Sequence, residues 1–440
     1  RFSYLASNGR GAAPMLALAH MARSPLNFVR MTLLLAFTIA FVLFSLVFTA
    51  SQTQHTYDVA AYQTGADFSG VPTNLTSFTF PVAQVLTAYR HLPGVASAST
   101  GHTEEVTTNN NAQSLNVELN AVDAQTFAQT VNWQQWNRQL SMPALLDQLA
   151  RRSNTARGIP ALVDSTLWNT LHLSVGAPFS LQTAGESESI PFVAMQEILY
   201  VPQNSSDTFS GTVVANFANY LKYYKDHFDA HDPLPTLNYV WVRADQHPAA
   251  IDKLRSALSS GFLQLSPLYD RVATAQTLQS DALYLNLVGI LLIGAITTLL
   301  LALLGNWLAS WVSVQARQTN FAILRALGTS PGQVAGVLVW EQCIVYSMAL
   351  VLGVLFGLFL IFTVVPVLVF TSVPVTGLGS VLGSNQFYGL QSAIPVRIVF
   401  SPFLMLALLA FIVVCTLVVG MMVRVVSKPS LGQMIRLNED

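Results

Sequence analysis

The sequence predicts a membrane protein with four transmembrane α-helices, one followed by three, and a large extracytoplasmic α+β domain inserted between the first and the second. Composition gives the first reason. The chain of 440 residues is 52% hydrophobic and only 10% charged, with a mean hydropathy of +0.47, whereas soluble chains are about a quarter charged. Length gives the second reason, because four apolar runs reach the roughly 18 residues that a helix needs to cross the hydrocarbon core.

The positions of these runs divide the chain into segments. About half of the chain separates the first run from the second, and this insert has ordinary globular composition. The predicted order is a cytoplasmic interfacial segment (1–28), a span (29–50), an extracytoplasmic α+β domain (51–281), a span (282–310), a cytoplasmic coupling segment (311–333), a span (334–370), an extracytoplasmic loop (371–401), a span (402–423) and a cytoplasmic tail (424–440).

Basic residues predict the orientation of the spans. Lys and Arg beside short loops stay in the cytoplasm. One connection, between the third and fourth spans, holds only Arg397. The opposite side holds nine basic residues, which are Arg1, Arg10, Arg23, Arg30, Arg317, Arg325, Arg424, Lys428 and Arg436. We therefore expect both termini in the cytoplasm.

Charge and cysteine usage narrow the setting of the inserted domain. From Ser51 to Leu283 the chain has 11 basic and 19 acidic residues, so its net charge is 11 − 19 = −8. This balance disfavours nucleic acid as a partner. Both cysteines, Cys343 and Cys415, lie inside apolar runs, so no disulfide framework is expected in the domain. A prokaryotic plasma (inner) membrane fits this absence better than a eukaryotic cell surface.

Local patterns predict both helices and strands outside the spans. Residues 114–123 alternate between apolar and polar side chains, as in a half-buried strand, and residues 239–244 form a second strand. Helices are expected at residues 81–91 and 248–260. Residues 270–284 lack turn residues, so we expect the second span to continue outward as a helical stalk. A short helix over residues 14–28 is expected to lie at the membrane surface.

The connection between the second and third spans has the most specific pattern. Residues 317–327 suit a helix with Phe321, Leu324 and Leu327 on one stripe, and Gly328 ends it. The sequence Ser330-Pro331-Gly332-Gln333 then has the spacing of a capping box. A short surface helix should therefore lead sharply into the third span.

These residues resemble the FtsX-like permease family, which includes MacB-like and Lol-type permeases. The resemblance rests on the run from Phe321 to Gly328, on Ser330, Pro331, Gln333 and Glu341, and on the tail from Leu431 to Leu437. The order of spans around a large outer domain is also similar. Weaker likenesses occur in the inserted domain, at residues 65–67, 92–95, 121–123 and 173–176. One departure is Asn320, where the family often has an acidic residue.

The resemblance implies a permease subunit of an ABC transporter. Its partners would be a cytosolic ABC ATPase subunit, a second permease unit and membrane lipid, and the ATPase would move the outer domains through the helices, a mode called mechanotransmission. The ATPase-coupling residues would be Arg317, Phe321, Leu324, Arg325 and Gly328. Residues 15–25 are similar to the start of the second repeat of long permeases, so the chain is expected to be the C-terminal half of one.

No motif predicts a catalytic, cofactor or metal site in this chain. The Walker A pattern is absent, so ATP is expected to bind the partner subunit and the chain is not expected to be an enzyme. His227 and His231 have the spacing of two metal ligands on a helix, but an exposed polar loop without a third ligand is the preferred interpretation.

Two features inside the spans are candidate sites. Glu341 lies about 12 Å along the third span. An intramembrane carboxylate is usually paired or functional, and the alternative is that Glu341 stays hydrated near the interface. Gly353 and Gly357 form a GxxxG pattern, which permits close helix approach.

Two other classes of function remain open at this point. A membrane-anchored sensor or regulator of cell-wall enzymes would need a cytoplasmic effector, whereas the cytoplasmic segments are short. A secondary transporter would need polar groups near the midplane of several spans. For an ABC permease, the sequence leaves open the export or extraction of a lipid, a lipoprotein, a peptide or a drug.

Overall fold

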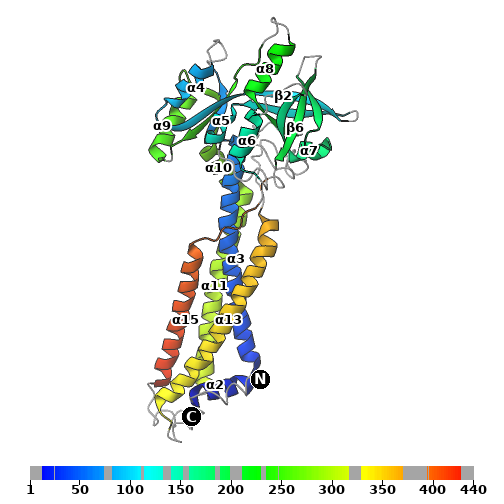
Figure 1. Cartoon of the computed structure of the whole chain (residues 1–440). Helices are drawn as coiled ribbons and strands as arrows, with labels where there is room; N and C mark the ends of the chain where they lie inside the picture. Colours follow the sequence, from blue (N-terminus) through cyan, green and yellow to red (C-terminus); the bar gives the residue numbers. More distant parts are fainter. Residues whose placement is uncertain are drawn as a thin grey trace. The chain divides into compact units, whose positions relative to one another are not determined.

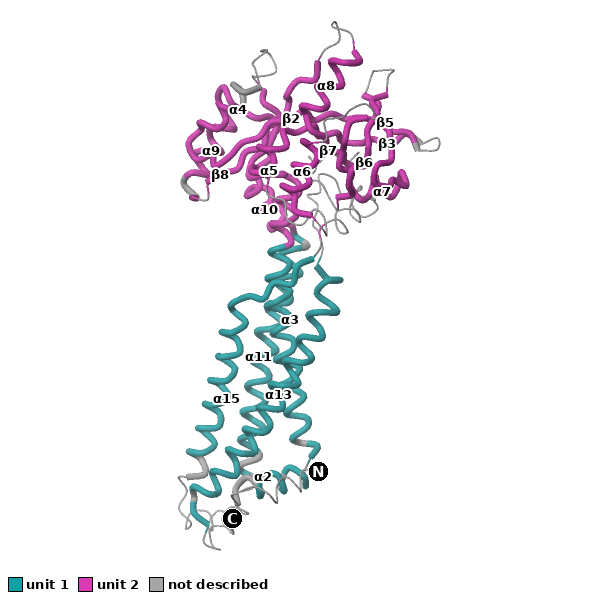
Figure 2. The backbone as a smooth tube through the Cα atoms, in the orientation of Figure 1, with its two compact units in different colours: residues 1–54, 282–370, 396–440 teal, residues 55–281, 371–395 magenta. Residues whose placement is uncertain are grey.

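The computed structural model describes residues 12–23, 25–73, 82–110, 113–131, 140–151, 158–183, 189–198, 211–228, 234–245, 247–316, 329–369, 394 and 396–427. The chain divides into two compact units, shown in different colours in Figure 2. Unit 1 comprises residues 1–54, 282–370 and 396–440, and unit 2 comprises residues 55–281 and 371–395.

Unit 1 is built from long apolar helices. Figure 1 shows the four long helices running alongside one another, and their bounds are α3 (Pro25–Thr64), α11 (Ala282–Ala316), α13 (Pro331–Leu368) and α15 (Phe403–Ser427). The shorter α2 (Ala12–Arg23) precedes α3 and lies across the direction of these helices. The four long helices contain segments long and apolar enough to cross a membrane, namely Phe28–Thr64, Tyr284–Val312, Gly332–Leu368 and Phe403–Arg424. The predicted fold class, one span followed by three with an α+β domain after the first, is confirmed.

All four long helices contribute to one apolar core in unit 1. Its buried members are Phe28, Leu35, Ile39 and Leu43 from α3, Ala302 from α11, Val345 and Ala349 from α13, and Phe411 and Cys415 from α15. The outward faces of α11 and α15 keep large apolar side chains exposed, Ile290 and Met405 among them. This pattern suits helices whose outer surface meets lipid.

Helix α3 extends well beyond residue 50. Residues 51–64 are more polar but contain neither glycine nor proline, so no residue in this stretch breaks the helix. The helix ends at Thr64 because Gly65 takes a positive φ of 71°, and the Gly65 N–H donates to the Ala61 carbonyl at 2.9 Å.

Unit 2 contains a nine-stranded sheet among its described residues. The strand order is β3-β7-β4-β6-β5-β2-β8-β1-β9, and an additional pairing of β2 with β3 closes the first six of these strands into a barrel. The strands are β1 (Phe68–Pro72), β2 (Val95–Asn110), β3 (Gln113–Val122), β4 (Ile159–Asp164), β5 (Pro178–Thr183), β6 (Ser189–Ile198), β7 (Thr212–Asn216), β8 (Tyr239–Ala244) and β9 (Leu265–Asp270).

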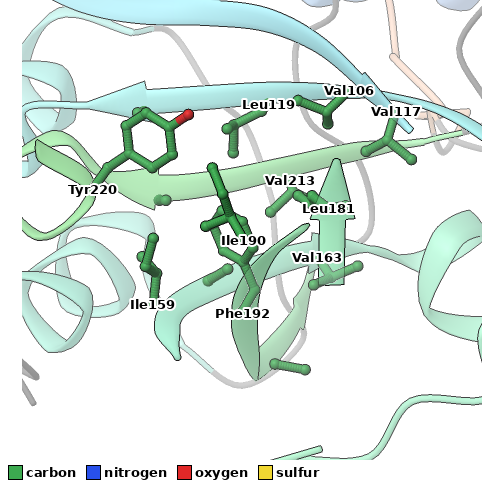
Figure 3. Packing of buried hydrophobic residues seen from close by; sticks show 14 of the residues in the cluster. Val106, Val117, Leu119, Ile159, Val163, Leu181, Ile190, Phe192, Val213 and Tyr220 are labelled. Atoms are coloured by element: carbon green, nitrogen blue, oxygen red, sulfur yellow. The ribbon is translucent and has the colours of Figure 1, made fainter. Parts of the chain in front are cut away.

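The barrel interior is filled by alternate side chains from its strands. The strand predicted at residues 114–123 is confirmed as β3, and Val117, Leu119 and Ala121 belong to the interior cluster. The expected half-buried pattern is wrong, because Glu118 and Asn120 on the other face are buried as well. Phe192 of β6 and Tyr220 of α8 complete the same cluster, and both are fully buried (Figure 3). Closure of the barrel places β2 between β3, β5 and β8, so this long strand connects the barrel to the open part of the sheet.

Seven helices are described in unit 2 besides the end of α3. They are α4 (Val82–Arg90), α5 (Ala124–Thr130), α6 (Met142–Arg151), α7 (Ser165–Thr170), α8 (Phe217–His227), α9 (Pro248–Ser259) and α10 (Arg271–Gln279). The helix predicted at residues 248–260 is confirmed as α9, and its Leu254 and Leu258 are fully buried against the sheet. The predicted continuous stalk is wrong, because α10 ends at Gln279 and α11 begins at Ala282.

Candidate functional site

The five residues expected to contact an ATPase lie outside the described residues. They are Arg317, Phe321, Leu324, Arg325 and Gly328. The structure does describe both sides of this segment, since α11 ends at Ala316 and α13 begins at Pro331.

A capping box defines the start of α13. The Ser330 hydroxyl accepts a hydrogen bond from the Gln333 backbone N–H at 3.4 Å, and the Gln333 side chain accepts one from the Ser330 N–H at 3.1 Å. Pro331 occupies the first turn. The reciprocal bonds fix the direction in which the chain enters the helix. The predicted capping box is present.

Gly353 and Gly357 lie one turn apart on α13 and face α3. A Cβ atom added at Gly353 would lie 2.7 Å from Ile39 Cβ and 2.9 Å from the Ala36 carbonyl oxygen. At Gly357 it would lie 3.1 Å from Leu43 Cδ1. The two helices therefore approach so closely at Gly353 that no larger residue fits without a shift.

Glu341 is 2% exposed on α13. Several uncharged polar groups are also buried nearby along the helices. Asn306 of α11 donates from Nδ2 to the Tyr346 hydroxyl of α13 at 2.9 Å. Ser310 of α11 and Gln342 of α13 are buried as well. The charge of Glu341 marks it in the sequence, whereas Asn306, Ser310, Gln342 and Tyr346 carry no such signal, because uncharged polar residues are common in apolar helices without a specific role.

Three carboxyl groups are buried among the described residues of unit 2, and two of them, Glu118 and Asp164, have raised pKa values. Burial raises the pKa of Glu118 to about 8, although a hydrogen bond with the Asn120 side chain opposes this shift. Burial likewise raises the pKa of Asp164 to about 7, against backbone hydrogen bonds from Leu167 and Thr212. Both residues lie beside Thr212 of β7. Glu118 of β3 is paired with Thr212, and Asp164 follows Val163, which is paired with Val213 in the antiparallel ladder of β4 and β7.

The role of Asp164 is evident from its contacts. Its Oδ1 accepts from the Leu167 N–H at 2.7 Å and caps α7, and its Oδ2 accepts from the Thr212 N–H at 3.2 Å. It therefore ties a helix start to strand β7. Glu118 has fewer bonds, since its buried Oε2 has no hydrogen-bond partner within the described part of the chain.

Histidines do not form a metal centre in the described part of the chain. No group of three or more His, Cys, Asp or Glu side chains is placed to hold a metal ion there. His227 lies at the end of α8, where its Nδ1 is 3.1 Å from the Tyr223 carbonyl oxygen and its ring stacks on the Tyr223 ring. His231 lies outside the described residues.

Comparison with known families identifies the C-terminal region. Residues 292–427 match the family described as FtsX-like permease C-terminal. The chain carries an FtsX-like permease domain. This domain contains the part of α11 from Leu292 to Ala316, all of α13 and all of α15. It also contains the connection between α11 and α13 that is predicted to contact an ATPase. No curated protein matches the chain at a significant level.

Solved structures similar to the chain are isolated domains. The periplasmic region of MacB from Actinobacillus actinomycetemcomitans aligns at 9% identity and a TM-score of 0.30, covering 50% of this chain and 95% of that one. The extracellular domain of the noncanonic ABC-type transporter YknZ from Gram-positive bacteria aligns at 10% identity and a TM-score of 0.27, covering 46% of this chain and 98% of that one. A domain of a putative permease protein from Porphyromonas gingivalis aligns at 14% identity and a TM-score of 0.25, covering 45% of this chain and 84% of that one.

Gly353→Ala should weaken the contact between α3 and α13. The added methyl group meets backbone and the branched carbon of Ile39, so the helices must separate, and we expect a loss of about 1–3 kcal/mol of stability. The measurement is thermal unfolding of the purified protein in detergent. Gly420→Ala on α15 is the matched control, because a Cβ there meets no atom within 4 Å. Equal melting temperatures for the two variants would contradict the close contact.

Glu118→Gln should stabilise unit 2 more at pH 8.5 than at pH 5. With a folded-state pKa of about 8 and an ordinary value of 4.5, the folded chain keeps a proton that the unfolded chain loses between these values. The free energy of unfolding therefore falls as pH rises through this window, and glutamine removes the fall, which is on the order of a few kcal/mol.

The measurement is the melting temperature of the full chain at both pH values. Asp226→Asn, at an exposed position on α8, is the control and should shift neither. A Glu118→Gln effect that is the same at both pH values would show that Glu118 is ionised in the folded protein.

Proposed function

We propose that the chain is the permease subunit of an ABC transporter and couples ATP hydrolysis in a separate cytosolic subunit to movement of its inserted domain. The observation that carries this proposal is the FtsX-like permease domain at residues 292–427. The proposal places both termini in the cytoplasm of a prokaryotic cell and unit 2 on the outer side of the plasma membrane. A second permease unit would complete the transporter.

The contact with the ATPase is assigned to residues 317–333. This segment connects two long helices, so a force on it reaches both α11 and α13. Phe321 and Leu324 offer an apolar stripe for a groove in the partner, with Arg325 beside it. The capping box at Ser330 supports transmission, because a fixed entry angle passes movement of the segment into α13.

Movement of α13 would reach α3 through the glycine contact. Gly353 and Gly357 hold the two helices at close range, so they are expected to shift together. Helix α3 is continuous from Pro25 to Thr64 and leads directly into β1 of the inserted domain. This covalent path supports mechanotransmission, in which the substrate itself does not pass between the spans. The substrate would be a lipid, a lipoprotein, a peptide or a drug that unit 2 exports or extracts.

Phe321→Ser combined with Leu324→Ser should abolish binding of the ATPase. Each buried apolar side chain contributes roughly 1.5–3 kcal/mol, so loss of both weakens the complex by about a hundredfold or more. Co-purification of a cytosolic ABC ATPase subunit with the chain from its native membrane, and stimulation of its ATP hydrolysis, are the measurements. Gln318→Ser in the same segment is the control and should keep both. Wild-type binding by the double variant, with the protein still in the membrane, would move the contact to another cytoplasmic segment.

A further inference from the structure

Buried polar side chains lie at matching levels on α11 and α13. Asn306 and Tyr346 are joined by the 2.9 Å hydrogen bond described above. The two helices run in opposite directions (Figure 1). One turn further along α11 is Ser310, and one turn earlier on α13 is Gln342, so both steps lead toward the α11–α13 connection. The helical repeat therefore puts Ser310 and Gln342 each one turn from the Asn306–Tyr346 bond, on the same side of it.

Three oxygen atoms at these two levels lack a hydrogen-bond partner. They are Asn306 Oδ1, Ser310 Oγ and Gln342 Oε1, each buried and each without a partner in the part of the chain that the structure describes. The residues themselves are 3%, 1% and 6% exposed. An unsatisfied polar group inside an apolar helix bundle is costly, so three within one turn point to a ligand that satisfies them together.

The chemistry of the three atoms selects the ligand. Amide oxygens only accept hydrogen bonds, whereas a hydroxyl can donate one. The Asn306 amide nitrogen already donates to Tyr346, which leaves its oxygen as an acceptor alone. A water molecule can donate to both amide oxygens and accept from the Ser310 hydroxyl, and buried waters typically make about three such bonds. A divalent cation needs about six oxygen ligands, which this group does not supply.

We propose that Asn306, Ser310 and Gln342 hold one buried water molecule that joins α11 to α13. Asn306 is bonded directly to Tyr346, and Tyr346 packs against the apolar cluster that contains Cys415 and Val345. A bridging water is enthalpically nearly as good as a direct hydrogen bond. Within the proposed function, this water adds to the direct bond between Asn306 and Tyr346 in holding α11 to α13 beside the segment that connects them.

A double-mutant cycle with Ser310→Ala and Gln342→Met tests the site in the purified full chain in detergent. Both replacements remove an oxygen and keep most of the side-chain volume. Each single variant is expected to lower the melting temperature, because it deprives the water of one bond. The double variant should lose little more than either single variant, because the water is already lost. Ser347→Ala, at an exposed position on α13, is the control and should change little.

X-ray radiolysis provides a direct readout of the water. Hydroxyl radicals formed at a bound water label the side chains beside it, so Tyr346 should be labelled in the wild-type protein and lose most of that label in the double variant. An unchanged or raised melting temperature in the single variants would overturn the proposal, since it would mean that the oxygens are simply unsatisfied. Coupled variants without labelling of Tyr346 would also overturn it, because Ser310 and Gln342 would then bond directly.

Discussion

The close approach of α3 and α13 at Gly353 and Gly357 is the contact on which the membrane-spanning unit depends. Lipid tails are as apolar as leucine side chains, so the hydrophobic effect does not hold helices together inside a membrane. Close van der Waals packing must do so instead. Gly353 brings its backbone against Ala36 and Ile39, and the surrounding side chains Leu35, Leu43 and Val345 then fill the core between the helices.

Helices α11 and α15 pack differently. The most apolar 18-residue segments of α11 and α15 are only 11% and 17% buried, whereas that of α3 is 56% buried. Most of the surface of α11 and α15 therefore faces away from the unit. Cβ atoms added at Gly289, Gly305 and Gly420 would meet nothing within 4 Å. Polar contacts also hold α11 in place: Asn306 donates to the Tyr346 hydroxyl of α13, and the Ser45 hydroxyl of α3 donates to the Leu291 carbonyl. A unit with one tightly packed helix pair and two looser helices is consistent with the helix movement proposed above.

The inserted domain is stabilised by a different principle. Its barrel excludes water from an apolar interior and satisfies the strand backbones through closure. Glu118 and Asp164 lie buried in this domain, and their raised pKa values, about 8 and about 7, both follow from burial. Asp164 offsets that cost by bonding two backbone N–H groups, whereas Glu118 offsets it by remaining protonated near neutral pH.

The sequence by itself determined the number, order and approximate limits of the four apolar helices. Hydrocarbon requires long uninterrupted apolar runs, and such runs are visible without any structure. Local signals were equally readable: the capping box at Ser330, the strand at residues 114–123 and the helix at residues 248–260 all depend on neighbours in the chain. The break between α10 and α11 was missed because residues 280 and 281 are neither glycine nor proline.

Only the tertiary structure decided which residues meet across the fold. The GxxxG pattern showed that α13 could approach another helix, but the identity of that helix depends on packing between segments more than 300 residues apart. Barrel closure is likewise set by pairings between distant strands, and no sequence signal marked Glu118 or Asp164 as buried. The polar group of Asn306, Ser310, Gln342 and Tyr346 has the same origin. Each residue alone is unremarkable, and their common level follows from two helices that run in opposite directions.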